Sequence, residues 1–451
     1  MQTVSRLTLS SLALGIAGVL AFGQADASGF QIRENSAQNM GRANAGTAVA
    51  WGDASVVLNN PAAMVNIEST TLQADITMID LTADFEGSGK TALGTPLSGN
   101  DGGDPGDATP VPAMAAVFPI SDQLVLGASV SAPFGLKTEY DPTWMGRYDA
   151  ITSDVKIVNL TLSAAYAVSD RFSVGAGVIL QNADVTLSKA IDFGTALCAG
   201  SGNPMNCFNP AFPFHPQQQD GLIDVSGDDA ALGWVAGVQF KASDRVTLGY
   251  AHRSEISHEL HGVADFTMPA SVAAALSVNP AGAGYVDSPI HAALDTPSTD
   301  TVSARFDISD DVRLLGEAQL TGWSSLQSVN ILRDDNTVVG AEAFEWDDSW
   351  FFSVGGEWDM SDALVLRAGV GMDETPTNDE HRTPRLPDND RMVYTFGMSW
   401  MASPRLSLDA SYMRVEIDTP TVNTTSSSSS HLVGSFDGYA NLLSVAARYR
   451  F

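Results

Sequence analysis

The chain has 451 residues, of which 53 are acidic and 23 are Lys or Arg, giving a formal net charge of -30. Nucleic acid is excluded as a natural partner, because so acidic a surface would repel its phosphates. Apolar residues make up 44% of the chain, but they alternate with polar residues and accompany 40 glycines. This composition favours strands with one face in lipid and the other toward a polar lumen, and argues against a water-soluble enzyme of several domains.

The first residues have the features of an export signal. Arg6 precedes an apolar run from Leu12 to Phe22, which is too short to cross a bilayer as a helix, and Ala25-Asp26-Ala27 offers small residues for cleavage. We predict that residues 1–27 are removed during secretion. No later segment has 18 uncharged apolar residues in a row, so no helical membrane anchor is expected.

Residues 28–64 precede the first predicted strand and lack its alternation. They are rich in Ala, Gly and Asn, and such small side chains can pack inside a lumen where bulky ones could not. We therefore expect this segment to fill the interior of a barrel. For Asn60-Pro61-Ala62 an ordinary turn is the alternative, since Asn-Pro pairs favour turns.

A short motif recurs six times: an apolar residue, a Ser, an Asp or Pro, one further residue and another apolar residue. Its serines are Ser121, Ser169, Ser243, Ser309, Ser361 and Ser403. Ser, Asp and Pro suit tight reversals, so each copy predicts a hairpin turn. Six turns at one rim join six pairs of strands, and the first and last strands meet at one open seam as a seventh pair. The sequence thus predicts an all-β fold, a 14-stranded antiparallel transmembrane β-barrel with short turns at one rim and long loops at the other.

Alternation of apolar and polar residues locates the strands, most clearly between Val158 and Val168. The predicted strands are 69–86, 111–120, 122–136, 154–168, 171–189, 228–242, 245–264, 299–308, 311–330, 344–359, 363–374, 391–402, 405–418 and 439–451. Several exceed the roughly 9 to 11 residues that cross a bilayer, so the barrel is expected to project above the membrane.

The third predicted strand contains the sequence Pro133-Phe134-Gly135. Proline lacks a ladder donor and glycine tolerates unusual dihedral angles, so this stretch is expected to interrupt the strand. The alternative is that the strand simply ends at the outer interface.

Two long outer segments, 190–227 and 265–298, are the expected entrance. The second carries an apolar run from Val272 to Val278, and exposed apolar surface commonly marks a binding site; a small helix folded onto its neighbour is the alternative. In the first, Cys198 and Cys207 lie close together, and the export context favours a disulfide over a metal site.

Few residues point to other chemistry. Lys189, Arg385 and Arg391 are candidate contacts for a substrate carboxylate. For Lys189 the alternative is a rim cation that binds lipid phosphates. For Arg385 and Arg391 the abundance of neighbouring Asp favours structural ion pairs. His252, His258 and His261 do not share one strand face, so no metal site is expected. No cofactor and no Ser-His-acid arrangement are predicted. Acidic loops such as Asp101 to Asp107 leave divalent-cation binding open.

The sequence resembles the long-chain fatty acid outer-membrane transporters, the FadL family, over almost the whole mature chain. The resemblance rests on Asn60-Pro61-Ala62, on APFGLKTEYDPTWMGRYDAI from Ala132, on LDTPST from Leu294, on TGWSS from Thr321 and on TPRLPDNDR from Thr383, in the expected order. It implies an N-terminal hatch at residues 28–68 inside a barrel formed by residues 69–451. The family's strand kink falls at Pro133 and Gly135. The last strand, ending in Phe451, resembles the signal read by the barrel-assembly machinery.

The resemblance implies a bacterial outer-membrane protein, not an enzyme, that passively takes up long-chain fatty acids, alkanes or aromatic hydrocarbons. In that family a ligand is captured at outer loops, passes a hatch and leaves sideways at the kinked third strand into the membrane lipids. The alternatives are a general porin for small polar solutes and, less favoured, an outer-membrane lipolytic enzyme. The sequence does not identify the ligand.

Overall fold

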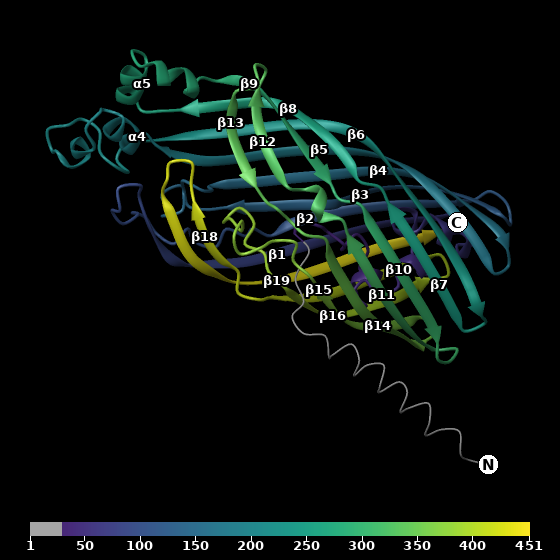
Figure 1. The fold of residues 1–451 in the computed structure, drawn as a ribbon. Coiled ribbons are helices and arrows are strands. Elements are labelled where there is room, and N and C mark those ends of the chain that lie inside the picture. Colours follow the sequence, from purple (N-terminus) through teal and green to yellow (C-terminus); the bar gives the residue numbers. More distant parts are fainter. Residues whose placement is uncertain (1–28) are drawn as a thin grey trace.

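The computed structural model describes residues 29–451, so the expected signal at residues 1–27 lies outside it. These residues form one closed antiparallel barrel (Figure 1). The first strand, β1 (Thr71–Lys90), pairs along its whole length with the last, β19 (His431–Arg450), which closes the sheet. Within residues 29–451, no helix is both long enough and apolar enough to cross a membrane.

The predicted number of strands is confirmed. Nineteen labelled segments make up the sheet, and five pairs of them are halves of one continuous barrel strand, which leaves fourteen. Between β1 and β19 the strands are β2 (Thr109–Pro119), β3 (Leu124–Glu139), β4 (Thr152–Ser169), β5 (Phe172–Asp192), β6 (Asp220–Ser243), β7 (Val246–Arg253) with β8 (Ile256–Thr267), β9 (Ser288–Thr296) with β10 (Thr299–Asp307), β11 (Val312–Thr321) with β12 (Ser328–Arg333), β13 (Val338–Ala343) with β14 (Ser349–Ser361), β15 (Leu364–Asp373), β16 (Arg391–Ser403), and β17 (Leu406–Ile417) with β18 (Thr421–Thr425).

The six repeated motifs form the six hairpin turns at one rim of the barrel. In each, the serine side chain accepts a hydrogen bond from the backbone N–H two residues later, at 3.3 to 3.4 Å. This bond holds the reversal, which is why the motif repeats wherever two strands must be joined tightly.

Strand boundaries differ from the prediction at the opposite rim. β6 begins at Asp220 and β19 at His431, each eight residues earlier than expected. β9 lies inside the expected loop 265–298, and the expected strand 311–330 is broken by η5 (Trp323–Ser325). These segments lie at the long-loop end of the barrel, where apolar and polar residues no longer alternate strictly and the sequence pattern is therefore weak.

Residues 29–66, here called the N-terminal segment, are coiled inside the barrel as α2 (Ala37–Met40), η1 (Thr47–Val49), α3 (Val56–Asn59) and η2 (Pro61–Asn66). Most of these residues are buried, whereas residues 31–34 are partly exposed and Trp51 is exposed. The fit is close enough to require glycine on both sides: a Cβ on Gly397 of β16 would lie 2.7 Å from the Cα of Gly41.

Two loops with short helices lie at the rim opposite the turns (Figure 1). The first contains α4 (Phe193–Ala199) and η3 (Pro204–Phe208), and the second contains α5 (Ala270–Leu276) and η4 (Pro280–Tyr285). Apolar side chains of Phe193, Val272 and Leu276 pack the two loops together.

Candidate functional site

The third barrel strand contains a bulge. The register of β3 against β4 shifts by one residue between Ser131 and Phe134. Ala132 and Pro133 together oppose a single residue of β4, so β3 carries one extra residue at this point. The bulge lies where the sequence predicts an interruption, and the ladder with β4 resumes at Phe134, one residue before Gly135.

On its other side, β3 loses its strand partner just before the bulge. The pair between β2 and β3 that lies farthest from their short turn joins Met114 to Val130. Beyond this pair, β2 continues to Thr109 beside β1 alone. Pro110 and Pro112 occupy this stretch, and proline is tolerated where a strand has a free edge. From this pair toward the long-loop rim, β2 and β3 form no ladder, so the wall between these two strands is open beside and beyond the bulge.

The N-terminal segment covers the free edge of β3. The N–H of Ile32 donates to the carbonyl of Pro133 at 2.8 Å, and the N–H of Gly135 donates to the carbonyl of Phe30 at 2.9 Å. Gln31, between them, forms an isolated antiparallel bridge with β3. Three residues of the interior segment therefore stand where a neighbouring strand would stand in an unbroken wall.

A cavity of about 390 Å³ lies at this gap. Its volume is within the range of small-molecule sites. Phe134 contributes from the lumen side, whereas Pro112 and Val158 belong to the exposed outer face. The cavity therefore has walls from both faces of the barrel. Its apolar lining comprises Phe30, Ile32, Ile79, Leu81, Pro110, Val111, Pro112, Phe134, Leu136, Val155, Ile157, Val158, Phe351, Leu386, Pro387, Val393, Met413, Val415, Ile417, Ala440 and Leu442.

An aromatic cluster that the sequence pattern does not reveal adjoins the cavity. Phe30 and Phe134 pack edge-to-face with Trp323 of η5, at centroid distances of 4.9 and 5.8 Å. Trp346 contacts Trp323 in the same geometry at 5.0 Å. The break between β11 and β12 turns Trp323 inward, where its side chain is fully buried. In the sequence, Gly322 and the two serines after Trp323 are the residues that indicate this break.

Buried charges hold the rest of the N-terminal segment in place. Arg42 pairs with Glu357 of β14 at 2.8 Å, and Arg367 and Arg313 pair with the same carboxylate at 2.8 and 3.1 Å. Glu317 of β11 accepts hydrogen bonds from the N-terminal segment and from β10. Removing one member of such a network leaves a buried charge uncompensated, which is costly.

Asn60, Pro61 and Ala62 lie at the start of η2 in the N-terminal segment. Asn60 caps η2 by accepting from the N–H of Ala62 at 3.1 Å, with Pro61 as the first helical residue. The same side chain donates to the carbonyls of Ala48 and Val238, at 2.8 and 3.1 Å. The turn thus joins the interior segment to β6 of the wall.

Two of the three candidate carboxylate contacts, Lys189 and Arg385, lie close enough to each other to interact electrostatically, and the third lies elsewhere. Arg391 lines the cavity and pairs with Asp388 at 2.6 Å. Arg385 is buried in the upper lumen, where it bonds to the carbonyls of Thr152 and Ser188 and lies 3.4 Å from Glu342. These two arginines therefore already have structural partners.

Lys189 projects into the upper lumen near the loop of residues 140–151. It is close enough to Asp149 to interact electrostatically. Burial raises the pKa of Asp149 to about 6, against the opposing effects of a hydrogen bond from Thr424 and of the Lys189 ammonium. Asp149 therefore titrates close to physiological pH.

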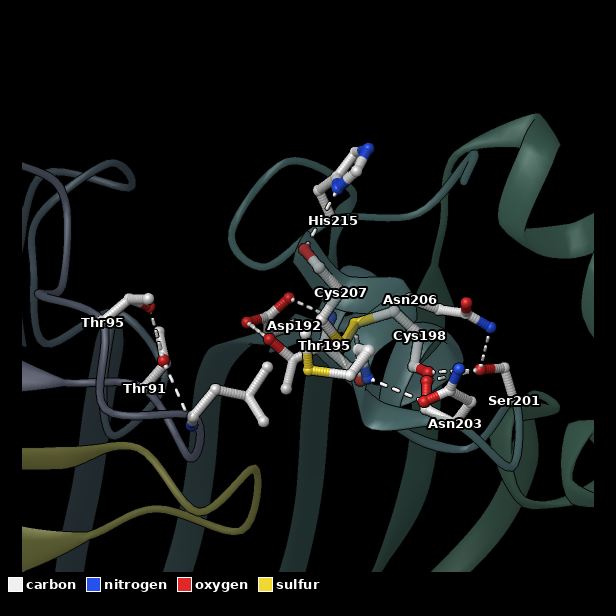
Figure 2. Close-up of a disulfide and its surroundings, with 12 residues drawn as sticks. Thr91, Thr95, Asp192, Thr195, Cys198, Ser201, Asn203, Asn206, Cys207 and His215 are labelled. Atoms are coloured by element: carbon white, nitrogen blue, oxygen red, sulfur yellow. Dashed lines mark hydrogen bonds between the residues drawn. A yellow bond between two sulfur atoms is a disulfide. The ribbon is translucent and has the colours of Figure 1, made fainter. Parts of the chain in front are cut away.

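The outer loops carry a disulfide and an apolar surface. Cys198 at the end of α4 and Cys207 in η3 are bonded to each other, with Asp192 capping α4 beside them (Figure 2). Met205 and Phe208, next to the second cysteine, and Val278 after α5 are exposed. The disulfide restrains the loop that carries Met205 and Phe208.

The histidines of β7 and β8 have separate partners. His252 bonds to Asp300 at 2.9 Å, whereas buried His258 bonds to Asp229 at 3.0 Å and to Gln181 at 2.9 Å. Among residues 29–451, no group of three or more His, Cys, Asp or Glu side chains is arranged to hold a metal ion.

Comparisons with known proteins agree with this architecture. Residues 18–451 match the family model described as outer membrane protein transport protein (OMPP1/FadL/TodX). Outer membrane protein P1 of Haemophilus influenzae is 27% identical over 421 residues, covering 88% of each chain. The long-chain fatty acid transport protein of Escherichia coli K12 is 25% identical over 431 residues, covering 92% of this chain and 93% of that one.

Solved structures extend the likeness to three dimensions. A FadL homologue of Pseudomonas aeruginosa superposes with a TM-score of 0.86 at 28% identity, covering 94% of this chain and all of that one. The toluene transporter TbuX of Ralstonia pickettii shares the fold at 17% identity, with a TM-score of 0.62 and coverage of 92% and 100%. The chain therefore belongs to the OMPP1/FadL/TodX family: it is a bacterial outer-membrane β-barrel and a transport protein rather than an enzyme.

Proposed function

We propose that this protein passively takes up long-chain fatty acids or other hydrophobic compounds across the outer membrane. The ligand is captured by the outer loops, passes the N-terminal segment, which acts as a hatch, and leaves sideways at the bulge in β3. The relatives named as a fatty acid transporter and as a toluene transporter support this range of ligands.

The cavity at the β3 bulge is the observation that carries the proposal. It has walls from both faces of the barrel, so a molecule in it is already partly within the wall. Lateral release is physically sensible, because exposing an alkyl chain to water costs about 0.8 kcal/mol per CH₂ group. A ligand that moves from this cavity into hydrocarbon avoids that cost.

The hatch role rests on the position of residues 30–32 along the free edge of β3. Backbone groups cannot remain unpaired in a bilayer, so the free edge of β3 needs a hydrogen-bonding partner. Passage of a ligand through the gap then requires this partner to move away. The N-terminal segment supplies two backbone hydrogen bonds there. A shift of these few residues would open the cavity to the lumen while the network around Arg42 holds the remainder.

Deleting Pro133 tests the exit. Because Ala132 and Pro133 oppose one residue of β4, the deletion leaves Ala132 opposite that residue and restores a regular register without moving Phe134. β3 then runs straight beside β2, which narrows the gap even though Pro110 and Pro112 donate no ladder hydrogen bonds. We expect uptake of a radiolabelled fatty acid by cells expressing the variant to fall at least tenfold, whereas ligand binding to the outer loops is retained.

Pro119→Val, at the turn end of β2 and outside the cavity lining, is the matched control and should transport normally. The folded state of both variants is checked by the heat-dependent mobility typical of outer-membrane barrels. Normal uptake through a β3 shown by a structure to be regular would reject the lateral exit and favour release at the short-turn end. The porin alternative is tested by liposome swelling with sugars. It requires that liposomes containing this protein swell at the rate of an open pore.

A further inference from the structure

Arg253, the last residue of β7, is a cation on the inner face of the barrel without a carboxylate partner. Its guanidinium donates to the carbonyl of Leu58 in the N-terminal segment at 3.2 Å, while its buried Nε has no hydrogen-bonding partner. Among residues 29–451, no carboxylate forms an ion pair with it. Arg42, by contrast, pairs with Glu357 at 2.8 Å. A buried polar group that the chain leaves unpaired indicates a partner from outside the chain, a water molecule or an ion.

A small polar cavity of about 40 Å³ lies beside Arg253. Its walls come from the N-terminal segment on one side and from β7, β10 and β11 on the other. Residues 31–33 line both this cavity and the larger one at the β3 bulge. A cavity needs roughly 10 to 15 Å³ to hold one water molecule, so this one has room for a small ion and its nearest water molecules but not for an alkyl chain.

Hydroxyl groups line the small cavity next to Arg253. Thr299 of β10 is the direct cross-strand partner of Arg253, and Thr301 follows on the same inner face. The hydroxyl of Thr301 accepts a hydrogen bond from the side-chain amide of Gln319 at 2.9 Å, which leaves its own proton to donate. The guanidinium and these hydroxyls can therefore all direct donors at one ligand.

The carboxylate in the lining of the small cavity, that of Glu317, lies at its other end. Glu317 stands opposite Ser303 in the ladder between β10 and β11, four residues along β10 from Thr299, which is roughly 13 Å of strand. Its Oε2 accepts hydrogen bonds from the N–H and the hydroxyl of Thr47, both at 2.6 Å. The end of the cavity at Arg253 therefore keeps an uncompensated positive charge.

We infer that the small polar cavity binds one monovalent inorganic anion of the chloride class as the counterion of Arg253. Arginine keeps its charge in proteins, and an enclosed charge is costly unless an opposite charge compensates it. Water satisfies the N–H groups but supplies no opposite charge. Because the anion lies between the wall and the N-terminal segment, its binding stabilises the closed position of that segment.

Bromide in place of chloride locates the ion. Crystals of the purified protein grown in sodium bromide without chloride should give an anomalous diffraction peak in the cavity beside the guanidinium of Arg253. Arg253→Gln removes the charge and keeps a polar side chain, so crystals of this variant should lack that peak while bromide ions on the protein surface remain. A native cavity that contains only water, or a peak that persists in Arg253→Gln, would overturn the inference.

Hydrogen exchange in the N-terminal segment measures the effect of the anion in solution. In lipid nanodiscs, sodium chloride should slow this exchange several-fold and saturably relative to sodium gluconate at equal ionic strength, since gluconate is too large for the cavity. Arg253→Gln should show no difference between the salts. Thr299→Val, which keeps the charge and removes one hydroxyl, should need several-fold more chloride for half of the effect. Arg305→Gln is the matched control, because Arg305 pairs with Asp307 at 2.8 Å and lies outside the cavity lining, and it should respond to chloride as the native protein does.

Decanoate distinguishes a resident inorganic anion from the carboxylate end of a long ligand. Its head carries the same charge as chloride, but its chain does not fit the small cavity. If decanoate slows the exchange through Arg253 while chloride and bromide have no effect, the site belongs to a transported ligand and the inference fails. If none of the three anions changes the exchange in the native protein, water alone satisfies Arg253 and the inference is rejected as well.

Discussion

At the scale of single residues, the molecule depends on buried charged groups with defined partners. Arg42 and Glu357 fix the N-terminal segment to the wall, and Asp149 joins the loop of residues 140–151 to β18 through Thr424. None of these contacts is visible as a sequence motif, because each joins positions hundreds of residues apart. Single substitutions are therefore the appropriate way to test them.

Asp149 should make the order of its loop depend on pH. Its pKa of about 6 in the folded protein lies above its ordinary value of 3.8, so folding favours the protonated form. The resulting stabilisation is present below about pH 4 and is lost as the pH rises through 6. Hydrogen exchange in residues 140–151, corrected for intrinsic rates, should be faster at pH 7.5 than at pH 5.

Asp149→Asn should remove this dependence, because the amide stays uncharged and can still accept from Thr424. Asp141→Asn, a change at an exposed carboxylate in the same loop, should leave the dependence intact. An unchanged pH dependence in Asp149→Asn would show that another group is responsible.

At the scale of secondary-structure elements, the loop between β5 and β6 depends on its disulfide. Replacing both Cys198 and Cys207 by Ser should leave the thermal unfolding of the barrel unchanged, since the bridge closes a loop of only nine residues in sequence separation. Locally it removes a restraint of about 2 to 3 kcal/mol, so hydrogen exchange in residues 193–219 should accelerate. Two reactive thiols in denatured, unreduced native protein would contradict the bridge.

The secondary-structure elements also show which features of the fold can be predicted from the sequence and which cannot. The turns were predictable because Ser121 and its five counterparts act locally, and the interruption at Pro133 follows from the missing donor of proline. The pairing of residues 30–32 with β3 was not predictable, because it joins segments about one hundred residues apart through backbone atoms. The sequence pattern predicts a continuous strand through Trp323, because a break of three residues changes a pattern of period two only slightly.

At the scale of the whole molecule, the interior of the barrel is occupied by the N-terminal segment. Deleting residues 28–64 should convert the protein into an open pore with a large, steady single-channel conductance in planar bilayers, whereas the full chain should conduct little. The deletion variant must retain heat-dependent mobility as proof of folding. An unchanged conductance in a folded variant would mean that other residues block the lumen.

The two hydrogen bonds between residues 30–32 and β3 have a consequence for the energetics of opening. Each backbone bond contributes about 0.5 to 1.5 kcal/mol net, so the two bonds together contribute about 1 to 3 kcal/mol. Releasing residues 30–32 also breaks the packing of Phe30 against Phe134 and Trp323, so the total cost is larger and the released state is a minor one. A ligand that binds the released state more tightly than the closed one would supply the difference, and in the proposed mechanism a gradient of the ligand itself sets the direction of flow.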